Sequence, residues 1–528
     1  MKTNNIVIVG GGSAGWMSAM TLLAAFPEKN ITVIESPDYP TVGVGESTPQ
    51  NIRSWTNFVG IKDEEFMSKT DATYKLSIRF NDFYKKGSGG YHYPFGLPNF
   101  ASGSEEYGLE GWHIMRHYHD APVQDYARTY FPQMAFLEKN RIDENVDGVF
   151  GSFKLDRDSA FHFDAVKFAN WLRDDKCIPG GVKLIPSTVK HVKTNDDGVE
   201  SLVLDDGTEV TGDLYLDCTG FKSMLLGGAL GEEFVSYENQ LPNNRALATQ
   251  LEYTDKRVQM NPYTTCTAID HGWVWNIPTW NKIGTGYVYN DRCISKEDAM
   301  EEFKKHLGRD DLEFRDIPFR VGIHRRTWVK NVVGIGLAAG FREPLESNGL
   351  LTIYEFLLKL VKVINREYVS NYDQEIYNIA NTTFFSNFAD FVTAHYIFGQ
   401  RRDNDYWKAI SKISVEDHPT LMDFGERKLI RHKFHNDLGD GYHCIATGLN
   451  YSVVDKSSLS IQEFNQGFSY RETADRLKQN WDRMKTFIDQ KSDRAPFHVD
   501  YLENRFYGQE KVRLENMGKG TRSKGREE

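Results

Sequence analysis

The chain of 528 residues is 40% hydrophobic and carries a formal net charge of −11 at pH 7. That length exceeds what one compact core accommodates, so we expect two closely packed domains or one large domain with an extended cap. The negative charge argues against nucleic acid and anionic membranes as partners, because both bind to clustered cationic side chains that this sequence does not concentrate.

We expect no targeting signal at the start of the chain. An apolar strand begins at residue 5, without the charged region, apolar stretch and cleavage site of a signal peptide. No apolar run approaches the roughly 20 residues that span a bilayer. The five widely spaced cysteines fit neither a disulfide framework nor a Cys-x-x-Cys site. We therefore expect a soluble, cytoplasmic protein with reduced thiols and no membrane partner.

The first motif in the chain is a nucleotide-binding βαβ unit. Residues 5–9 (NIVIV) form a short apolar strand, residues 10–15 match Gly-x-Gly-x-x-Gly and open a helix, and a second strand over 30–34 ends on Glu35. The glycines let backbone amides approach a pyrophosphate, the helix N-terminus favours negative charge, and the acid accepts hydrogen bonds from a ribose. One such motif predicts one bound dinucleotide. The predicted contacts are Gly10, Gly12, Ser13, Ala14, Gly15 and Glu35.

Two later stretches predict further contacts with the dinucleotide. Residues 42–49 (VGVGESTP) form a loop because of their Gly and Pro content. Residues 213–220 (DLYLDCTG) read as a buried strand that ends in a turn. Before the second stretch, 181–194 and 198–204 look like paired antiparallel strands, where we expect Val189 to meet the adenine.

A third stretch lies in the second half of the chain. Residues 331–336 (NVVGIG) form a strand that runs into glycines, and residues 337–350 lead into the helix LTIYEFLLKLVKVI. Small residues bring the backbone close to a cofactor, and unpaired amides at a helix start suit a small anion. A plain helix start also shows Glu, Ser and Asn as cap residues, so both interpretations stay open here.

The most informative motif lies in the middle of the chain, where residues 273–278 read Trp-Val-Trp-Asn-Ile-Pro. Alone, it could be a buried strand and turn with two core tryptophans. In the company of the other motifs, its Trp-x-Trp-x-Ile-Pro pattern resembles the signature of the flavin-dependent halogenases of the tryptophan-halogenase type. The stretches that carry this resemblance are 10–16, 42–48, 161–172, 213–221, 272–278, 284–289, 334–350, 390–396 and 444–450, with Lys75 within DATYKLSIRF.

The resemblance implies an α/β fold. An aromatic-hydroxylase-like, Rossmann-type FAD-binding box with a mixed sheet is expected over residues 1–350, and a mainly helical substrate cap, the pyramid, over 351–508. The tail over 509–528 is rich in charged residues and glycine, so we expect it to be flexible.

The resemblance also implies the chemistry. FADH2 from a separate flavin reductase reacts with O2 to a flavin hydroperoxide, and chloride, bromide or iodide attacks it to give hypohalous acid. Lys75 then holds this oxidant, or carries its halogen as a haloamine, for electrophilic substitution on an aromatic small molecule. A lysine suits this role because its pKa shifts readily near a dry pocket. Glu346 matches the second catalytic residue, which stabilises charge on the arene, orients the oxidant or accepts the ring proton.

The remaining site residues follow from the same resemblance. Trp273 and Trp275 keep the organic substrate away from the flavin. Ser347, Asn348 and Gly349 match the halide site, where backbone amides make the contact, so an Asn in place of the commoner Thr at 348 need not abolish binding. The further flavin contacts are Ser47, which stands where Ala is commoner, and Asp217, Leu337 and Leu350.

The substrate region departs from the tryptophan-specific members of the family. The aromatic pairs and the Glu that hold the indole and its amino-acid head group in those members are missing from 429–437 (LIRHKFHND), ahead of 441–444 (GYHC). We therefore expect free tryptophan to be a poor substrate. Residues 91–95 (YHYPF) form either one wall of the pocket or a turn packed on the core.

Other functions stay open. Flavin motifs alone do not choose between halide and carbon as the oxygen acceptor, so a flavin monooxygenase of the same fold is one alternative, and a halogenase that acts on a carrier-tethered substrate is another. An FAD-binding protein without turnover conflicts with the presence of both Lys75 and Glu346. His113 and His117 lie four residues apart, but no Glu follows His113 as in His-Glu-x-x-His, so we predict no metal site. A homo-oligomer is compatible with all of these.

Overall fold

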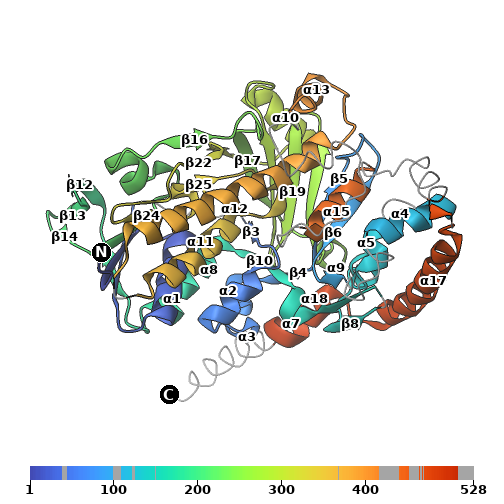
Figure 1. The fold of residues 1–528 in the computed structure, drawn as a ribbon, viewed down its shortest axis with the longest axis horizontal. Coiled ribbons are helices and arrows are strands. Elements are labelled where there is room, and N and C mark those ends of the chain that lie inside the picture. The colour runs from blue at the N-terminus through green and yellow to red at the C-terminus, as the bar shows by residue number, and fades with distance from the viewer. Residues whose placement is uncertain are drawn as a thin grey trace, which may run out of the picture.

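The structure, a computed structural model, describes the chain except for residues 39–44, 99–108, 120, 122–124, 149, 367, 415–438, 451–462, 464–465, 468 and 509–528. Two main sheets lie beside one another, with helices packed around them (Figure 1). The predictions for residues 42–44, for 429–437 and for the tail fall outside the described residues. No helix in the described part of the chain combines the length and apolarity needed to cross a membrane.

The first sheet is the expected Rossmann-type sheet. β1 (Asn5–Val9) pairs in parallel with β2 (Asn30–Glu35) and with β15 (Leu214–Asp217), and β15 pairs in parallel with β24 (Val332–Gly334). The strands are apolar because parallel sheets are covered on both faces. Helix α1 (Ser13–Ala25) connects β1 to β2, which confirms the predicted βαβ unit. The sheet order is β11 (Lys183–Pro186), β2, β1, β15, β24 and β23 (Trp328–Val329).

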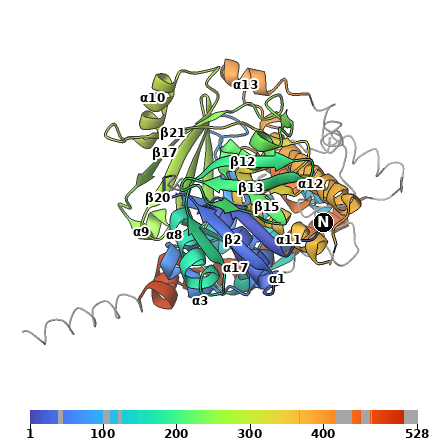
Figure 2. The same cartoon turned by 90° about the vertical axis from the view of Figure 1, so that its left-hand side faces the viewer.

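One strand prediction is partly wrong. The sequence predicts residues 181–194 as a partner of 198–204, whereas β11 pairs in parallel with β2, and only β12 (Val189–Asn195) pairs with β13 (Gly198–Leu204). Pro186 ends β11 because proline has no N–H to donate to a strand ladder. The chain then enters a separate sheet of β12, β13 and β14 (Glu209–Val210), which Figure 2 shows beside the strands of the first sheet.

The second sheet has seven strands and carries the Trp-x-Trp motif near its centre. β19 (Gly272–Pro278) lies between β18 (Thr264–Ile269) and β20 (Ile283–Tyr289) and is antiparallel to both, which confirms the predicted strand. Trp273 and Trp275 are two residues apart on one strand, so their side chains share a face of this sheet. The sheet order is β21 (Arg315–Pro318), β17 (Arg245–Leu251), β20, β19, β18, β5 (Ser77–Asn81) and β6 (Gly90–Pro94).

A small third sheet brings distant segments of the chain together. β10 (Ala160–Asp164) lies between β3 (Gly45–Ser47) and β4 (Thr73–Lys75), antiparallel to both. Its register places His162 directly across from Ser47 on one side and from Thr73 on the other. Directly opposed side chains in a sheet point to the same face, so these three side chains form a row.

The long helices after residue 348 pack on this framework. α11 (Gly349–Ile364) and α12 (Asn371–Ile397) run beside one another in front of the sheets, and α17 (Arg471–Arg494) lies at the far end of the molecule from the N-terminus (Figure 1). The Met1 amino group donates to the Val369 carbonyl over 2.8 Å, so this helical part contacts the start of the chain directly. The described residues of 351–508 are mainly helical, as predicted, and the domain division at residue 350 stays a prediction.

The other elements are shorter. The remaining helices are α2 (Ile52–Val59), α3 (Asp63–Phe66), α4 (Leu109–Tyr118), α5 (Asp125–Tyr130), α6 (Met134–Leu137), α7 (Leu155–Asp158), α8 (Ala165–Trp171), α9 (Lys256–Gln259), α10 (Lys296–Leu307), α13 (Asp405–Ile410), α15 (Gly439–Gly448) and α18 (His498–Leu502). The remaining strands are β7 (Leu97–Pro98), β8 (Asn145–Asp147), β9 (Gly151–Lys154), β16 (Phe234–Ser236), β22 (Gly322–His324) and β25 (Gly340–Phe341). Short 3-10 and π-helical turns are η1 (Ser68–Thr70), η2 (Leu172–Cys177), η3 (Gly220–Lys222), η4 (Met224–Ala229), η5 (Gly336–Ala338), η6 (Pro344–Glu346) and η7 (Glu503–Tyr507).

Candidate active site

Lys75 is a buried cation at the end of β4. Its side chain is fully inaccessible to solvent, and its Nζ donates a 2.8 Å hydrogen bond to Oγ of Ser347. The Nζ also lies 5.3 Å from the ring centroid of Phe95. Burial away from water lowers the pKa of Lys75 to about 7, because the charged form loses its hydration. Both the ammonium and the neutral amine are therefore accessible near neutral pH.

Glu346 ends the short turn η6 and is equally buried. Its Oε1 accepts a 2.6 Å hydrogen bond from Nε2 of His395, which belongs to α12. A carboxylate can only accept, so Nε2 of the ring carries the proton. The other nitrogen, Nδ1, then accepts a 2.7 Å hydrogen bond from the hydroxyl of Tyr91 on β6. His395 thus fixes the carboxylate, a role that no local sequence pattern around it indicates.

Ser347 connects the two predicted catalytic residues. Its backbone has a φ of 58°, in the left-handed region that non-glycine residues seldom adopt and that costs about 1–2 kcal/mol. This turn directs the Glu346 side chain to His395 and the Ser347 hydroxyl to Lys75. Backbone strain of this kind at a non-glycine residue is commonly found at functional sites.

The predicted halide residues form the start of α11. The Asn348 side chain donates to the Glu343 carbonyl over 2.8 Å, so this N-cap residue makes no side-chain hydrogen bond to the first amides of the helix. Such amides favour an anion. The carboxyl of Glu46 on β3 faces the same place: its Oε2 lies 3.9 Å from the position that a Cβ would occupy at Gly349. Burial raises the pKa of Glu46 to about 7.

The two tryptophans of β19 are buried side by side. Their ring centroids lie 6.2 Å apart. The Trp273 indole N–H donates a 3.3 Å hydrogen bond to Oε2 of Glu343, which also accepts from Asn243 and Tyr396. Glu343 is fully buried, so these donors supply the partners that its carboxylate loses on leaving water. Both tryptophans are recognisable from the sequence motif, whereas the role of this carboxylate is not.

The glycine loop between β1 and α1 fits a dinucleotide. Gly10 has a φ of 114°, and a Cβ there would lie 2.4 Å from the Cys218 carbonyl oxygen. A Cβ at Gly12 would meet no atom within 4 Å, so the loop leaves room on that side. Gly12 caps α1 without a side-chain hydrogen bond, and no acid lies in the first turn that contains Ser13 and Ala14. These amides therefore suit the pyrophosphate of FAD.

Glu35 and the stretch around Gly336 pack against the glycine loop. Glu35 leaves no room for a side chain at Gly11, because a Cβ there would lie 2.2 Å from the Glu35 carboxyl carbon. The guanidinium of Arg173 lies 3.4 Å from Oε2 of Glu35. A Cβ at Gly15 would lie 1.8 Å from the Gly10 carbonyl oxygen, so only glycine permits this close approach of strand and helix. The third predicted stretch comes close as well, since a Cβ at Gly336 would lie 3.2 Å from that of Ala14.

The other predicted flavin contacts lie in different surroundings. Val189 is buried at the start of β12, Leu337 is half-buried in η5, and Leu350 is buried in α11. The Asp217 carboxylate accepts backbone N–H groups of Leu225 and Leu226 over 2.8 and 2.9 Å, so it anchors the turn η4. Ser47 is hydrogen-bonded to the hydroxyls of Ser347 and Thr264 over 3.0 and 2.7 Å.

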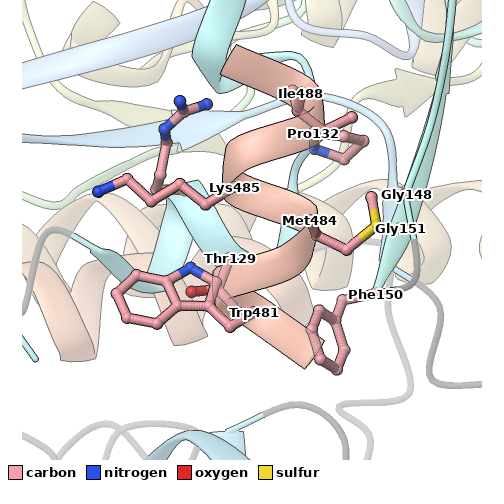
Figure 3. Close-up of a pocket in the computed structure, with 10 residues that line it drawn as sticks. Thr129, Pro132, Gly148, Phe150, Gly151, Trp481, Met484, Lys485 and Ile488 are labelled. Carbon is pink, nitrogen blue, oxygen red and sulfur yellow. The ribbon is translucent and has the colours of Figure 1, made fainter. Parts of the chain in front are cut away.

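Two cavities differ in how close they lie to these residues. Figure 3 shows a small one of about 20 Å³ between α5, α17 and the β8–β9 hairpin, and none of the predicted site residues lines it. A larger one of about 200 Å³ is lined by Tyr91, Arg116 and the end of α15, among others. Tyr91 belongs both to this cavity and to the hydrogen-bonded chain of Glu346. Residues 90–94 form the strand β6, so the expected turn is wrong, and the pocket wall stays a prediction.

The histidines of α4 and His119, which directly follows it, do not form a metal cluster in the described residues. His119 Nε2 lies 2.9 Å from Asp475 of α17, and the rings of His117 and Tyr118 are in edge contact. The side chain of His113 is outside the described residues. Among the described side chains, no group of three His, Cys, Asp or Glu residues is arranged to hold a metal ion.

Comparisons with known proteins cover most of this chain. The sequence model of the tryptophan halogenase family matches residues 5–438. The chain is 33% identical over 438 residues to tryptophan 7-halogenase RebH of Lentzea aerocolonigenes, covering 79% of this chain and 80% of that protein. The fold matches the VirX1 apo structure with a TM-score of 0.87 at 34% identity, covering 96% and 100% of the two chains. It matches BrvH, a flavin-dependent halogenase from Brevundimonas sp. BAL3, with a TM-score of 0.81 at 30% identity, covering 95% and 99%.

Proposed function

Because this chain belongs to the tryptophan halogenase family of flavin-dependent enzymes, we propose that it halogenates an aromatic small molecule other than free tryptophan, with Lys75 and Glu346 as its catalytic residues. The observation that carries this proposal is the arrangement around the 346–347 peptide. Ser347 contacts the buried Lys75, and Glu346 is fixed by His395. Two ionisable groups are thereby held at one buried site in a family that uses FAD and halide.

The flavin is expected to bind at the glycine loop of α1. When bound in its reduced form, FAD supplies with O2 the oxidising equivalent that turns halide into hypohalous acid. A separate reductase delivers the FADH2, because the sequence has one dinucleotide motif. Trp273 and Trp275 form a rigid wall that keeps the arene from the flavin, and the amides of Asn348 and Gly349 hold the halide.

Lys75 positions the oxidant. As an ammonium, Nζ donates a hydrogen bond to hypohalous acid and makes its halogen more electrophilic. As an amine, it forms a bond to the halogen and releases water. A pKa near 7 gives both forms at neutral pH, and burial keeps competing water away.

Glu346 acts on the arene. A carboxylate beside the developing ring cation stabilises it and accepts the ring proton after the halogen has added. His395 and Tyr91 hold one carboxylate oxygen in place, so little reorganisation is needed during the reaction.

The substrate proposal rests on residues 429–437, which lack the aromatic pairs of the tryptophan-specific members. Aromatic faces hold an indole by stacking, and their loss removes that contact. We expect indoles without the amino-acid head group, phenols and anilines to be better substrates than tryptophan.

The test is a turnover panel with purified protein, FAD, a generic flavin reductase, NADH and each halide, against those three arene classes and tryptophan. Mass spectrometry reads the products, and Lys75→Ala and Glu346→Gln run alongside. A halogen mass shift that both variants lose supports the proposal. An oxygen mass shift points to a monooxygenase, tight tryptophan binding with turnover contradicts the substrate assignment, and halogenation only of a carrier-bound arene contradicts a free substrate.

A further inference from the structure

A continuous chain of buried hydrogen bonds leads away from Lys75. Its Nζ contacts Oγ of Ser347 at 2.8 Å, that hydroxyl contacts Oγ of Ser47 at 3.0 Å, and Ser47 contacts Oγ1 of Thr264 at 2.7 Å. Thr264 in turn lies 2.9 Å from Nε2 of His162. All five side chains are buried, so water does not compete for these bonds.

The far end of the chain is a backbone carbonyl. Nδ1 of His162 lies 3.2 Å from Oγ1 of Thr73, and that hydroxyl lies 2.6 Å from the carbonyl oxygen of Pro278. A carbonyl oxygen can only accept, so the single hydroxyl proton of Thr73 points to Pro278. Thr73 must then accept from His162, which places the ring proton on Nδ1.

This end fixes the direction of every other bond. A neutral imidazole with its proton on Nδ1 has an acceptor at Nε2, so the Thr264 hydroxyl donates to it. Thr264 must accept from Ser47, and Ser47 must accept from Ser347. The Ser347 hydroxyl has then used its only proton, and towards Lys75 it can act only as an acceptor.

We propose that Ser47, Thr264 and His162 are positioning residues for Lys75: through the Ser347 hydroxyl they keep an acceptor aimed at Nζ and favour its protonated form. This inference rests on the proposed catalytic role of Lys75. An acceptor for the charged form stabilises it, whereas a hydroxyl free to turn would donate to the neutral amine and favour that form instead. The hydrogen-bond chain thus partly offsets the lowering of the Lys75 pKa by burial.

The charge belongs at Lys75 rather than at His162. Burial lowers the pKa of His162 well below its ordinary value, and the positive charge of Lys75 acts in the same direction. Glu346 and Cys266 face Lys75, and His498 faces His162. Burial raises the pKa of the Cys266 thiol, so it stays neutral, and Glu346 is the anion that supports the ammonium.

The chain depends on Ser47 in particular. It stands where Ala is commoner in the resembling family stretch, and a methyl group could neither accept from Ser347 nor donate to Thr264. Ser47→Ala is also a small change in a buried place, so the fold should tolerate it. The substitution therefore breaks the hydrogen-bond chain while leaving the packing of the site nearly unchanged.

The experiment measures the pKa of Lys75 itself, by NMR on protein with isotope-labelled lysine, without flavin or halide. Lys75→Met identifies its signal. We expect Ser47→Ala and Thr264→Val to lower this pKa by about one unit, the size of one hydrogen bond to a charged group. Thr264→Ser keeps the hydroxyl and should restore the original value. The Lys75-dependent limb of the kcat profile against pH should move to lower pH by the same amount.

Thr70→Val is the matched control, because Thr70 is a buried threonine whose hydroxyl donates only to the Phe66 carbonyl in the described structure. It should leave both readouts unchanged. An unchanged Lys75 pKa in folded Ser47→Ala and Thr264→Val proteins overturns the inference, even in an active halogenase. A lowered pKa in a protein that halogenates nothing supports the chain and overturns the proposed function instead.

Discussion

The indole N–H of Trp273 donates to Oε2 of Glu343 over 3.3 Å, at a place where both side chains are fully buried. Two further side chains, Asn243 and Tyr396, donate to the same carboxylate. The hydrogen bond fixes the rotation of the indole ring, which packing against apolar neighbours alone would leave less defined. Glu343 therefore fixes the orientation of Trp273, the residue proposed to keep the arene from the flavin.

Replacing Glu343 by Leu should loosen the tryptophan wall. We expect the yield of halogenated product per FADH2 oxidised to fall about tenfold, because the buried donors of Trp273, Asn243 and Tyr396 lose their acceptor, which costs more than about 1 kcal/mol. The measurement is the ratio of product to hydrogen peroxide released. Glu343→Gln should have a smaller effect, since it retains an acceptor. The exposed carboxylate Glu252 gives a control in Glu252→Gln, and an unchanged ratio in both Glu343 variants would contradict the role.

The Tyr91–His395–Glu346 chain predicts graded losses of activity. We expect His395→Phe to lower kcat about 100-fold, because Glu346 loses the donor that orients it. Tyr91→Phe removes only the outer bond and should lower kcat about tenfold. Neither change should alter the KM for halide. Tyr377→Phe is the control for loss of a buried tyrosine hydroxyl, since Tyr377 lies on α12 and donates to the Phe356 carbonyl. Equal effects of His395→Phe and Tyr377→Phe on kcat would show that the chain has no catalytic importance.

The sequence predicts those parts of the site that local pattern determines. The glycine loop, the strand over 273–278 and the start of α11 follow from residue types within short windows, and their places in the fold are as expected. Glu343 lies within the stretch 334–350, but its position is also typical of an acidic residue near the start of a helix. Its role becomes visible only when β19 brings Trp273 to it.

The hydrogen-bonded chain of Lys75 is the clearest case of what the sequence could not show. Ser47, His162 and Thr264 are separated by about a hundred residues each, and their contact depends on the register of β3 and β10 and on the approach of β18. A shift of one of these strands by a single residue would turn Ser47, His162 or Thr264 to the other face of its sheet. No periodicity in the sequence encodes that registration.

Burial of Lys75 also makes stability depend on pH. The pKa of Lys75 falls from 10.5 to about 7 on folding. Between these values the unfolded chain binds a proton that the native protein does not, so stability rises with pH through this window. Below about pH 7 both states are protonated, and the full penalty of the buried charge remains.

Lys75→Met should therefore raise the melting temperature by several degrees at about pH 6.5, and this gain should shrink towards about pH 10. Calorimetry or fluorescence melting at matched ionic strength measures it. Lys305→Met, which removes an exposed lysine of α10, should show no such trend. A gain for Lys75→Met that grows with pH would have the wrong sign for a buried cation.

Glu46 gives the predicted halide site its own pH dependence. Its carboxyl faces Gly349 and has a pKa raised to about 7 by burial. Below this pH it is neutral and compatible with a neighbouring halide, and above it the carboxylate repels the anion. The KM for halide should therefore rise about tenfold per pH unit above pH 7. Lys75 also loses charge near pH 7, so the comparison must be made against Glu46→Gln at each pH. Glu46→Gln should keep the halide KM low and leave only the weaker dependence due to Lys75, whereas parallel curves for the two proteins would place the halide away from Glu46.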